Sequence, residues 1–272
     1  MSRDIKYLEN KAKGLRKEIW EMVYNAQSGH IGGSFSIIET LVALYFDVMK
    51  YDPQNPKVPD RDRFVLSKGH TAPALYAVLA EAGFFPKEWL RDSFRKIDSK
   101  LQGHPDMKKT PGIDMTSGSL GIGLSAANGM ALGGKAQGIE FNVYCMMGDG
   151  EIDEGQIWEA AATAAHYHLD NLIAFVDKNG LQNDGKTVNV KDLGNIADKW
   201  NAFGWYVQEI DGNNFNEIFD AVDKAKACKD KPSVIIQHTV KGKGLSFTED
   251  VVVWHGKTPS NKEYIKGLEE LS

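Results

Sequence analysis

Helical and extended hydrophobic patterns alternate along most of the chain. Apolar residues recur at helical spacing over residues 4–27, where Leu8, Leu15 and Ile19 are typical members. Residues 141–147 instead form a short, continuously apolar run with the length of a buried strand. The same patterns predict further helices at about 36–50, 71–83, 154–169, 193–204 and 215–228, and further strands at 63–70 (running into a loop), 171–179, 205–211 and 233–240.

Apolar strands separated by helices are typical of a parallel sheet that is covered on both faces. We therefore predict an α/β fold, in which a doubly wound, mainly parallel sheet carries helices on both faces. The prediction is a single domain over residues 1–272, with a less regular tail from about residue 241. Glycines break the helical pattern at 28–34, and residues 98–124 form a long loop rich in Gly, Pro, Ser and Thr. A loop of that length inside a compact domain is often functional.

Charge and cysteine content argue against several classes of function. The 272 residues carry a formal net charge of −5, so no general basic field attracts nucleic acid or an anionic membrane. No segment has roughly 18 consecutive apolar residues, and the charged N-terminal stretch lacks the apolar part of a signal peptide. The two cysteines show no zinc or disulfide spacing. We therefore expect a cytoplasmic protein that binds neither nucleic acid nor a membrane.

Two glycine-containing turns follow predicted strands and carry the groups that a metal–diphosphate site requires. They are GDGEIDEG (148–155) and DKNG (177–180). In a parallel sheet, the carboxyl ends of neighbouring strands share one edge, and ligands bind there. Asp149 offers a carboxylate, Asn179 an amide oxygen and Leu181 a backbone carbonyl. Mg²⁺ takes about six oxygen ligands, commonly including substrate phosphates. Either turn alone is more often simply a turn.

Several blocks of the sequence together resemble one known family. They are SGHIGGS (28–34), DRDRFVLSKGH (60–70), QGHPD (102–106), TSGSLGIGLSAANGMAL (116–132), MGDGEIDEGQIWEA (147–160), LIAFVDKNGLQNDG (172–185) and WHGKTP (254–259). In this order they resemble the N-terminal, thiamine-diphosphate-binding domain of transketolase. The resemblance implies transfer of a two-carbon ketol unit from a ketose phosphate to an aldose phosphate, in carbohydrate metabolism such as the pentose phosphate pathway.

The resemblance also implies thiamine diphosphate and Mg²⁺ as cofactors, with Ca²⁺ or Mn²⁺ able to replace Mg²⁺. By position, Asp149, Asn179 and the Leu181 carbonyl resemble the metal ligands of the family. Gly150 resembles the residue whose amide meets the diphosphate.

Gly118 and Leu120 resemble the residues whose backbone meets the aminopyrimidine ring of the cofactor. The family usually has proline where this chain has Ser119. The stretch between GSLGIG and GDG is also shorter than in common full-length relatives, which suggests a trimmed helix or loop.

Four of the seven histidines lie in glycine-containing loops within these blocks: His30, His70, His104 and His255. Ketol transfer develops negative charge on a sugar oxygen, and imidazoles can donate hydrogen bonds to it and shuttle protons. The resemblance implies that His30, His70 and His104 surround the reacting carbon, and that His70 and His255 reach the diphosphate. The sequence does not assign the acid or the base. The remaining histidines are expected to be structural: His166, His168 and His238.

Transketolases are longer chains whose later domains supply the cofactor-activating glutamate and the arginines that hold the sugar phosphate. The resemblance therefore implies half an active site, completed by a separate C-terminal subunit as in split transketolases. A fragment of a longer protein is the alternative. Glu154 and Glu159 resemble residues at the family's dimer contact, although acids in the first turns of a helix also complement its dipole. The expected assembly is a dimer of heterodimers, a heterotetramer.

Two other functions remain open from the sequence. One is a different thiamine-diphosphate enzyme, such as a deoxyxylulose-phosphate synthase-like protein. The other is a non-catalytic module that binds a diphosphate or stabilises a partner.

Overall fold

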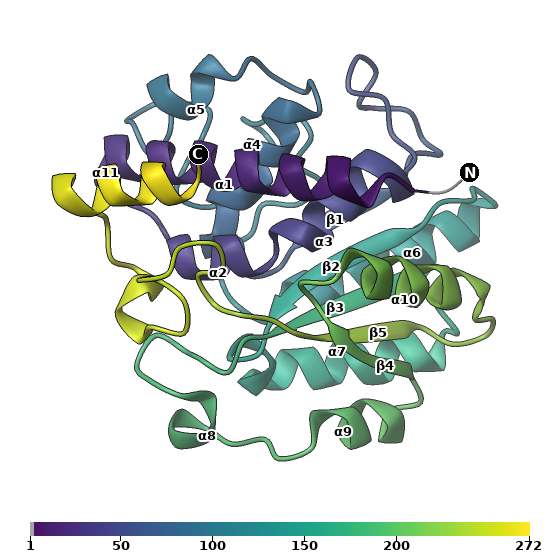
Figure 1. Ribbon diagram of the computed structural model, residues 1–272. Helices are drawn as coiled ribbons and strands as arrows, with labels where there is room; N and C mark the ends of the chain where they lie inside the picture. Colours follow the sequence, from purple (N-terminus) through teal and green to yellow (C-terminus); the bar gives the residue numbers. More distant parts are fainter. Residues whose placement is uncertain (1–2) are drawn as a thin grey trace.

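The computed structural model describes residues 3–272 and contains one parallel sheet of five strands (Figure 1). The strands are β1 (Arg63–Leu66), β2 (Val143–Gly148), β3 (Leu172–Lys178), β4 (Tyr206–Asp211) and β5 (Ser233–His238). Their order across the sheet is β1-β2-β3-β5-β4, and all neighbouring pairs run parallel. The predicted α/β fold with a parallel sheet is confirmed.

Helices connect the strands and cover both faces of the sheet (Figure 1). The first one starts at an N-cap, where the Asp4 carboxylate accepts a hydrogen bond from the Tyr7 N–H at 3.0 Å. The α-helices are α1 (Ile5–Ala26), α2 (Ile31–Ser36), α3 (Ile38–Ala43), α4 (Ala72–Glu81), α5 (Glu88–Asp92), α6 (Gly123–Gln137), α7 (Gly155–His166), α8 (Thr187–Val190), α9 (Ile196–Ala202), α10 (Phe215–Ala227) and α11 (Asn261–Glu270).

Alternate side chains of each central strand enter opposite cores, which explains why these strands are apolar throughout. In β2, Tyr144 and Met146 pack with residues of α1, α3, α4 and α10. Val143, Cys145 and Met147 pack on the other face, with residues of α6, α7 and α9. All five side chains are fully buried. A strand buried on both faces has no solvent side, and so it lacks polar alternation.

The glycine break after α1 is shorter than predicted. The chain is helical again from Ile31, so Gly32 and Gly33 lie inside α2. A Cβ added at Gly33 would lie 2.9 Å from Thr71 Cγ2, and one at Gly32 would lie 3.1 Å from Lys241 Cγ. These glycines therefore allow close approach of neighbouring segments rather than stopping the helix. The helix predicted at about 36–50 is divided into α3 and a π-helical turn at Leu44–Val48.

Two irregular segments complete the fold. Residues 93–122 contain neither helix nor strand, in agreement with the long loop predicted there. After β5 the chain forms another loop before α11, which packs on α1: the Trp20 indole donates a hydrogen bond to the Tyr264 carbonyl at 3.1 Å. Within residues 3–272, every helix is too short or too polar to cross a membrane.

Candidate active site

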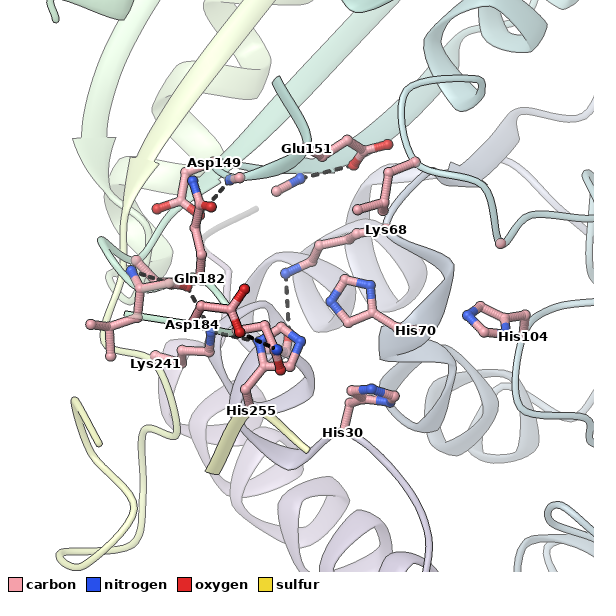
Figure 2. Close-up of a pocket in the computed structure, with 18 residues that line it drawn as sticks. His30, Lys68, His70, His104, Asp149, Glu151, Gln182, Asp184, Lys241 and His255 are labelled. Atoms are coloured by element: carbon pink, nitrogen blue, oxygen red, sulfur yellow. Dashed lines mark hydrogen bonds between the residues drawn. The ribbon is translucent and has the colours of Figure 1, made fainter. Parts of the chain in front are cut away.

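The loops that follow β1, β2, β3 and β5 meet α2 around one cavity of about 350 Å³ (Figure 2). Every site residue predicted from the sequence lines it: His30, His70, His104, Gly118, Leu120, Asp149, Gly150, Asn179, Leu181 and His255. Gly148, in the GDG turn, also lines it. The sequence did not single out the remaining lining residues: Gly33, Lys68, Glu151, Gln182, Asn183, Asp184 and Lys241.

The tips of β2 and β3 place Asp149 and Asn179 side by side, because their strands pair directly. The Asp149 carboxylate accepts hydrogen bonds from the backbone N–H groups of Gly150 (2.9 Å) and Gly180 (2.7 Å). Burial raises the pKa of Asp149 to about 6, and the negative charge of Asp177 adds to this. A carboxylate in such surroundings is ionised more readily beside a cation.

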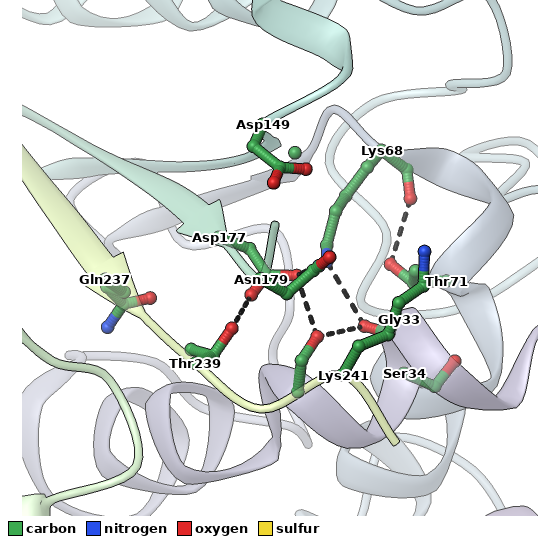
Figure 3. Close-up of polar contacts among 12 residues, drawn as sticks. Gly33, Ser34, Lys68, Thr71, Asp149, Asp177, Asn179, Gln237, Thr239 and Lys241 are labelled. Atoms are coloured by element: carbon green, nitrogen blue, oxygen red, sulfur yellow. Dashed lines mark hydrogen bonds and ion pairs between the residues drawn. The ribbon is translucent and has the colours of Figure 1, made fainter. Parts of the chain in front are cut away.

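Asp177, at the end of β3, is the centre of a buried polar network (Figure 3). Its carboxylate accepts hydrogen bonds from Lys68 Nζ at 2.5 Å, Ser36 Oγ at 2.7 Å, Asn179 Nδ2 at 2.8 Å and the Thr239 hydroxyl. Burial alone would raise the pKa of Asp177, but the charge of Lys68 and these hydrogen bonds outweigh it and lower the pKa. The network joins four segments of the chain. It also sets the orientation of the Asn179 side chain, because its Nδ2 must face the Asp177 carboxylate and its Oδ1 must therefore point away.

The third oxygen donor predicted at the site, the Leu181 carbonyl, accepts a hydrogen bond from Lys241 Nζ at 2.7 Å. Lys241 is buried, which lowers its pKa to about 8, although Asp149 favours its charged form. The ammonium also lies 2.9 Å from His255 Nδ1. A carbonyl has two lone pairs, so Leu181 retains one for another ligand.

Glu151 holds the glycine-rich 117–122 loop against the tip of β2. Its buried carboxylate accepts hydrogen bonds from the N–H groups of Gly121 (2.9 Å) and Gly148 (3.0 Å) and from the Ser67 hydroxyl. Burial raises the pKa of Glu151, and the Ser67 hydrogen bond opposes this. Glu151 therefore sets the position of the loop that carries Gly118 and Leu120.

The four predicted histidines form one cluster around the cavity (Figure 2). The His30 ring centroid lies 5.2 Å from that of His70 and 5.5 Å from that of His255. Burial lowers the pKa of His30 to about 4 and that of His255 to about 3, and it lowers the pKa of His70 well below its usual value. Burial also lowers the pKa of His104. These imidazoles are therefore neutral at pH 7, and each ring has one donor and one acceptor nitrogen.

The other three histidines lie outside this cavity, as predicted. His166 ends α7 and is exposed. His168 Nδ1 lies 2.9 Å from the Asp230 carbonyl, and His238 Nε2 lies 2.9 Å from the Glu209 carboxylate.

The cavity suits an anionic ligand that is bridged by a hard cation. Lys68 and Lys241 bring two ammonium groups to it. At Gly150 an added Cβ would lie 2.9 Å from Gln182 Cγ, so glycine is what allows this close packing at the wall of the cavity. Within residues 3–272, no group of three or more His, Cys, Asp and Glu side chains is arranged to hold a metal ion. Asp149, Asn179 and the Leu181 carbonyl offer three oxygen donors, and such donors fit a hard cation such as Mg²⁺ when phosphate oxygens complete its shell.

The chain matches the thiamine-diphosphate-binding domain of transketolase over residues 9–270. It is 50% identical, over 97% of its length and 96% of the relative, to the 6-deoxy-6-sulfo-D-fructose transketolase subunit SqwG of Clostridium sp. (strain MSTE9). It is 42% identical, over 98% of its length and 95% of the relative, to one subunit of the apulose-4-phosphate transketolase of Phocaeicola vulgatus.

The fold also matches solved transketolases. The enzyme from Leishmania mexicana superposes with a TM-score of 0.93 and 31% identity, over 97% of this chain but 41% of that one. The two relatives that the chain matches over nearly their whole length are named as subunits. In contrast, the chain spans less than half of the Leishmania mexicana transketolase chain. The chain belongs to the transketolase family, as a thiamine-diphosphate-binding subunit of the split type.

Proposed function

We propose that this protein is one half of a transketolase that transfers a two-carbon ketol unit from a ketose to an aldose. The proposal rests on one observation: the glycine-containing turns at the ends of β2 and β3 and four neutral histidines all line the same cavity. A non-catalytic diphosphate-binding module would need the turns but not the histidines. The blocks QGHPD and GSLGIG resemble transketolase and favour ketol transfer over a deoxyxylulose-phosphate synthase-like reaction.

The proposed cofactors are thiamine diphosphate and Mg²⁺, with Ca²⁺ or Mn²⁺ as substitutes. Asp149, Asn179 and the Leu181 carbonyl would hold the metal. Lys68 and Lys241, with His70, His255 and the Gly150 N–H, are the groups placed to bind the diphosphate, and the backbone at Gly118 and Leu120 would meet the aminopyrimidine. When bound, thiamine diphosphate supplies the carbon nucleophile that makes cleavage of the sugar C–C bond possible.

The histidines would act on the sugar oxygens. A neutral imidazole donates a hydrogen bond to an oxygen that gains negative charge, and such stabilisation is strongest where water is excluded. His30, His70 and His104 line the cavity from three different segments of the chain, so they can contact different hydroxyl groups of one sugar. Burial lowers the pKa of all three rings, which favours their neutral form.

The proposed partner is a C-terminal subunit with a pyrimidine-binding domain, in a dimer of heterodimers. Apolar side chains are exposed beside the cavity at Leu120 and Ile122, and Val253 is 58% exposed near His255. Glu154 lies next to this apolar rim, since a Cβ at Gly121 would be 2.8 Å from the Glu154 Cβ. Glu154 and Glu159 are exposed and are the acids expected at the contact.

The proposed substrates are ketoses that carry an anionic end group. One relative is named for 6-deoxy-6-sulfo-D-fructose and another for apulose 4-phosphate, so both sulfonated and phosphorylated sugars are candidates. A role in the pentose phosphate pathway and a cytoplasmic location remain predictions from the sequence.

The test is reconstitution of the chain with its C-terminal partner, thiamine diphosphate and Mg²⁺. Ketol transfer is measured by aldehyde release from 6-deoxy-6-sulfo-D-fructose and from ketose phosphates, with pyruvate as a competing donor. Transfer from an anionic ketose supports the proposal. Pyruvate decarboxylation in its place would reject it, and so would the absence of cofactor binding in the presence of the partner.

A further inference from the structure

The His30 ring is hydrogen-bonded to a guanidinium that has no part in the proposed function. Arg95 Nη2 lies 3.3 Å from His30 Nδ1. A guanidinium carries only donors and stays protonated, so His30 Nδ1 must act as the acceptor in this contact. A neutral imidazole has one N–H, and that proton must therefore be on Nε2.

Arg95 is held firmly by the loops on both sides of it. Its Nη1 donates a hydrogen bond to Ser28 Oγ at 2.7 Å, and its Nη2 also approaches the Gly103 carbonyl at 3.5 Å. The guanidinium packs against Gly103, where an added Cβ would lie 3.3 Å from Arg95 Cζ. The backbone of Arg95 has φ 54°, a left-handed conformation, and the backbone N–H of Arg95 donates a hydrogen bond to the Leu101 carbonyl at 2.7 Å.

Every charged or titratable group that acts on His30 disfavours a second proton on its ring. Arg95 and Lys241 are cations, and His104 also lowers the pKa of His30. The neighbouring rings are those of His70 and His255. No carboxylate hydrogen-bonds to the His30 ring within residues 3–272, so its orientation depends on Arg95.

We infer that Arg95 is a positioning residue that fixes His30 in the Nε2–H tautomer, so that His30 presents a donor and not a base to a ligand in the cavity. The tautomer follows from the geometry alone. Its use on a substrate oxygen rests on the proposed function, where a fixed donor would stabilise developing negative charge.

The tautomer can be measured directly by nitrogen NMR of the full chain labelled with ¹⁵N-histidine. The His30 signals are assigned by their loss in His30→Gln. We expect Nδ1 to resonate as an unprotonated nitrogen and Nε2 as a protonated one at pH 7. In Arg95→Met, the population with the proton on Nδ1 should rise from a minor fraction to a comparable or larger one.

Two further variants separate positioning from a general structural effect. Arg91→Met removes an exposed guanidinium that pairs with Asp92 and should leave the His30 signals unchanged. Arg95→Lys retains a cationic donor and should restore much of the Nε2–H population. In the reconstituted enzyme, Arg95→Met should lower kcat by roughly tenfold or more, with a smaller change in KM.

A wild-type His30 with its proton on Nδ1 would overturn the inference, whether or not any variant folds. An Arg95→Met spectrum with the wild-type tautomer would also overturn it. Failure of ketol transfer in the wild-type enzyme, with the NMR result as expected, would reject the proposed function and leave the tautomer assignment intact.

Discussion

The buried pair of Lys68 and Asp177 gives the most quantitative prediction about this fold. The side chains are 2% and 0% exposed. Lys68→Met leaves the Asp177 carboxylate without its cation, although the hydroxyls of Ser36 and Thr239 and the Asn179 amide still donate to it. Removing one partner of a buried ion pair costs about 3–5 kcal/mol, and the three remaining donors favour the lower part of that range.

The reverse change, Asp177→Asn, leaves the Lys68 ammonium buried without an anion, with only neutral acceptors such as the Gly33 carbonyl at 3.2 Å and the new amide oxygen. We expect a cost of similar size. The double variant Lys68→Met/Asp177→Asn contains no buried charge here, and its amide oxygen can still accept hydrogen bonds. It should therefore be more stable than the sum of the single changes predicts, by about 2–4 kcal/mol.

The assay is denaturant unfolding of all four proteins without added cofactor. Lys87→Met is the matched control, because Lys87 is 51% exposed and pairs with Glu81 at the surface. That change should cost less than about 1 kcal/mol. Strict additivity of the two buried changes would refute this account of the network. Equal costs for Lys68→Met and Lys87→Met would refute it too.

Three smaller predictions concern packing, acid stability and ligand affinity. In α6, Gly123→Ala should lower the free energy of unfolding by about 2–4 kcal/mol, because the new Cβ would lie 2.3 Å from Ser67 Cβ. Gly129→Ala has open space around it and should raise the free energy of unfolding by about 0.5–1 kcal/mol. The midpoints of urea unfolding of the two variants and the wild type check both values. The pKa of His30 is lowered to about 4, so the unfolded state binds more protons below about pH 6.5 and stability falls as the pH drops. His30→Gln should remove on the order of 1 kcal/mol of that fall between pH 7 and 4.5, and an unchanged fall would contradict the assignment. Lys241→Met should weaken binding of thiamine diphosphate with Mg²⁺ by roughly 10- to 100-fold in calorimetry, because a charged hydrogen-bond donor is lost; unchanged affinity would place the diphosphate elsewhere.

The parallel sheet and the site loops could be predicted because their signals are local. A strand buried on both faces reads as a continuous apolar run, and GDG or Asn-Gly directly after it marks a turn at the strand's carboxyl end. The pairing of β2 with β3 then brings Asp149 and Asn179 together. The four histidines were found because each lies in a glycine-containing loop within a block that resembles transketolase; the loop alone would not have distinguished them from ordinary loop histidines.

The residues that the sequence did not reveal depend on tertiary packing. Lys68 precedes Gly69 and His70 directly, yet nothing in its neighbourhood distinguishes a buried ammonium from the exposed lysines elsewhere. Glu151 is one of several acids in GDGEIDEG, and only the fold turns it inward to hold the 117–122 loop. The helical state of Gly32 and Gly33 was missed because local glycine content predicts a break, whereas close packing against neighbouring segments favours a helix.

The proposed function depends on a divalent cation that the tips of β2 and β3 hold together and that bridges to a diphosphate. The decisive experiment is calorimetric titration of thiamine diphosphate into the chain with its C-terminal partner, with Mg²⁺ or with a chelator. We expect saturable binding that requires the metal and that is lost in Asp149→Ala. Binding should be retained in Asp192→Ala, which removes an exposed carboxylate outside the cavity. Tight binding to the Asp149→Ala variant, or binding that is indifferent to the metal, would contradict this expectation.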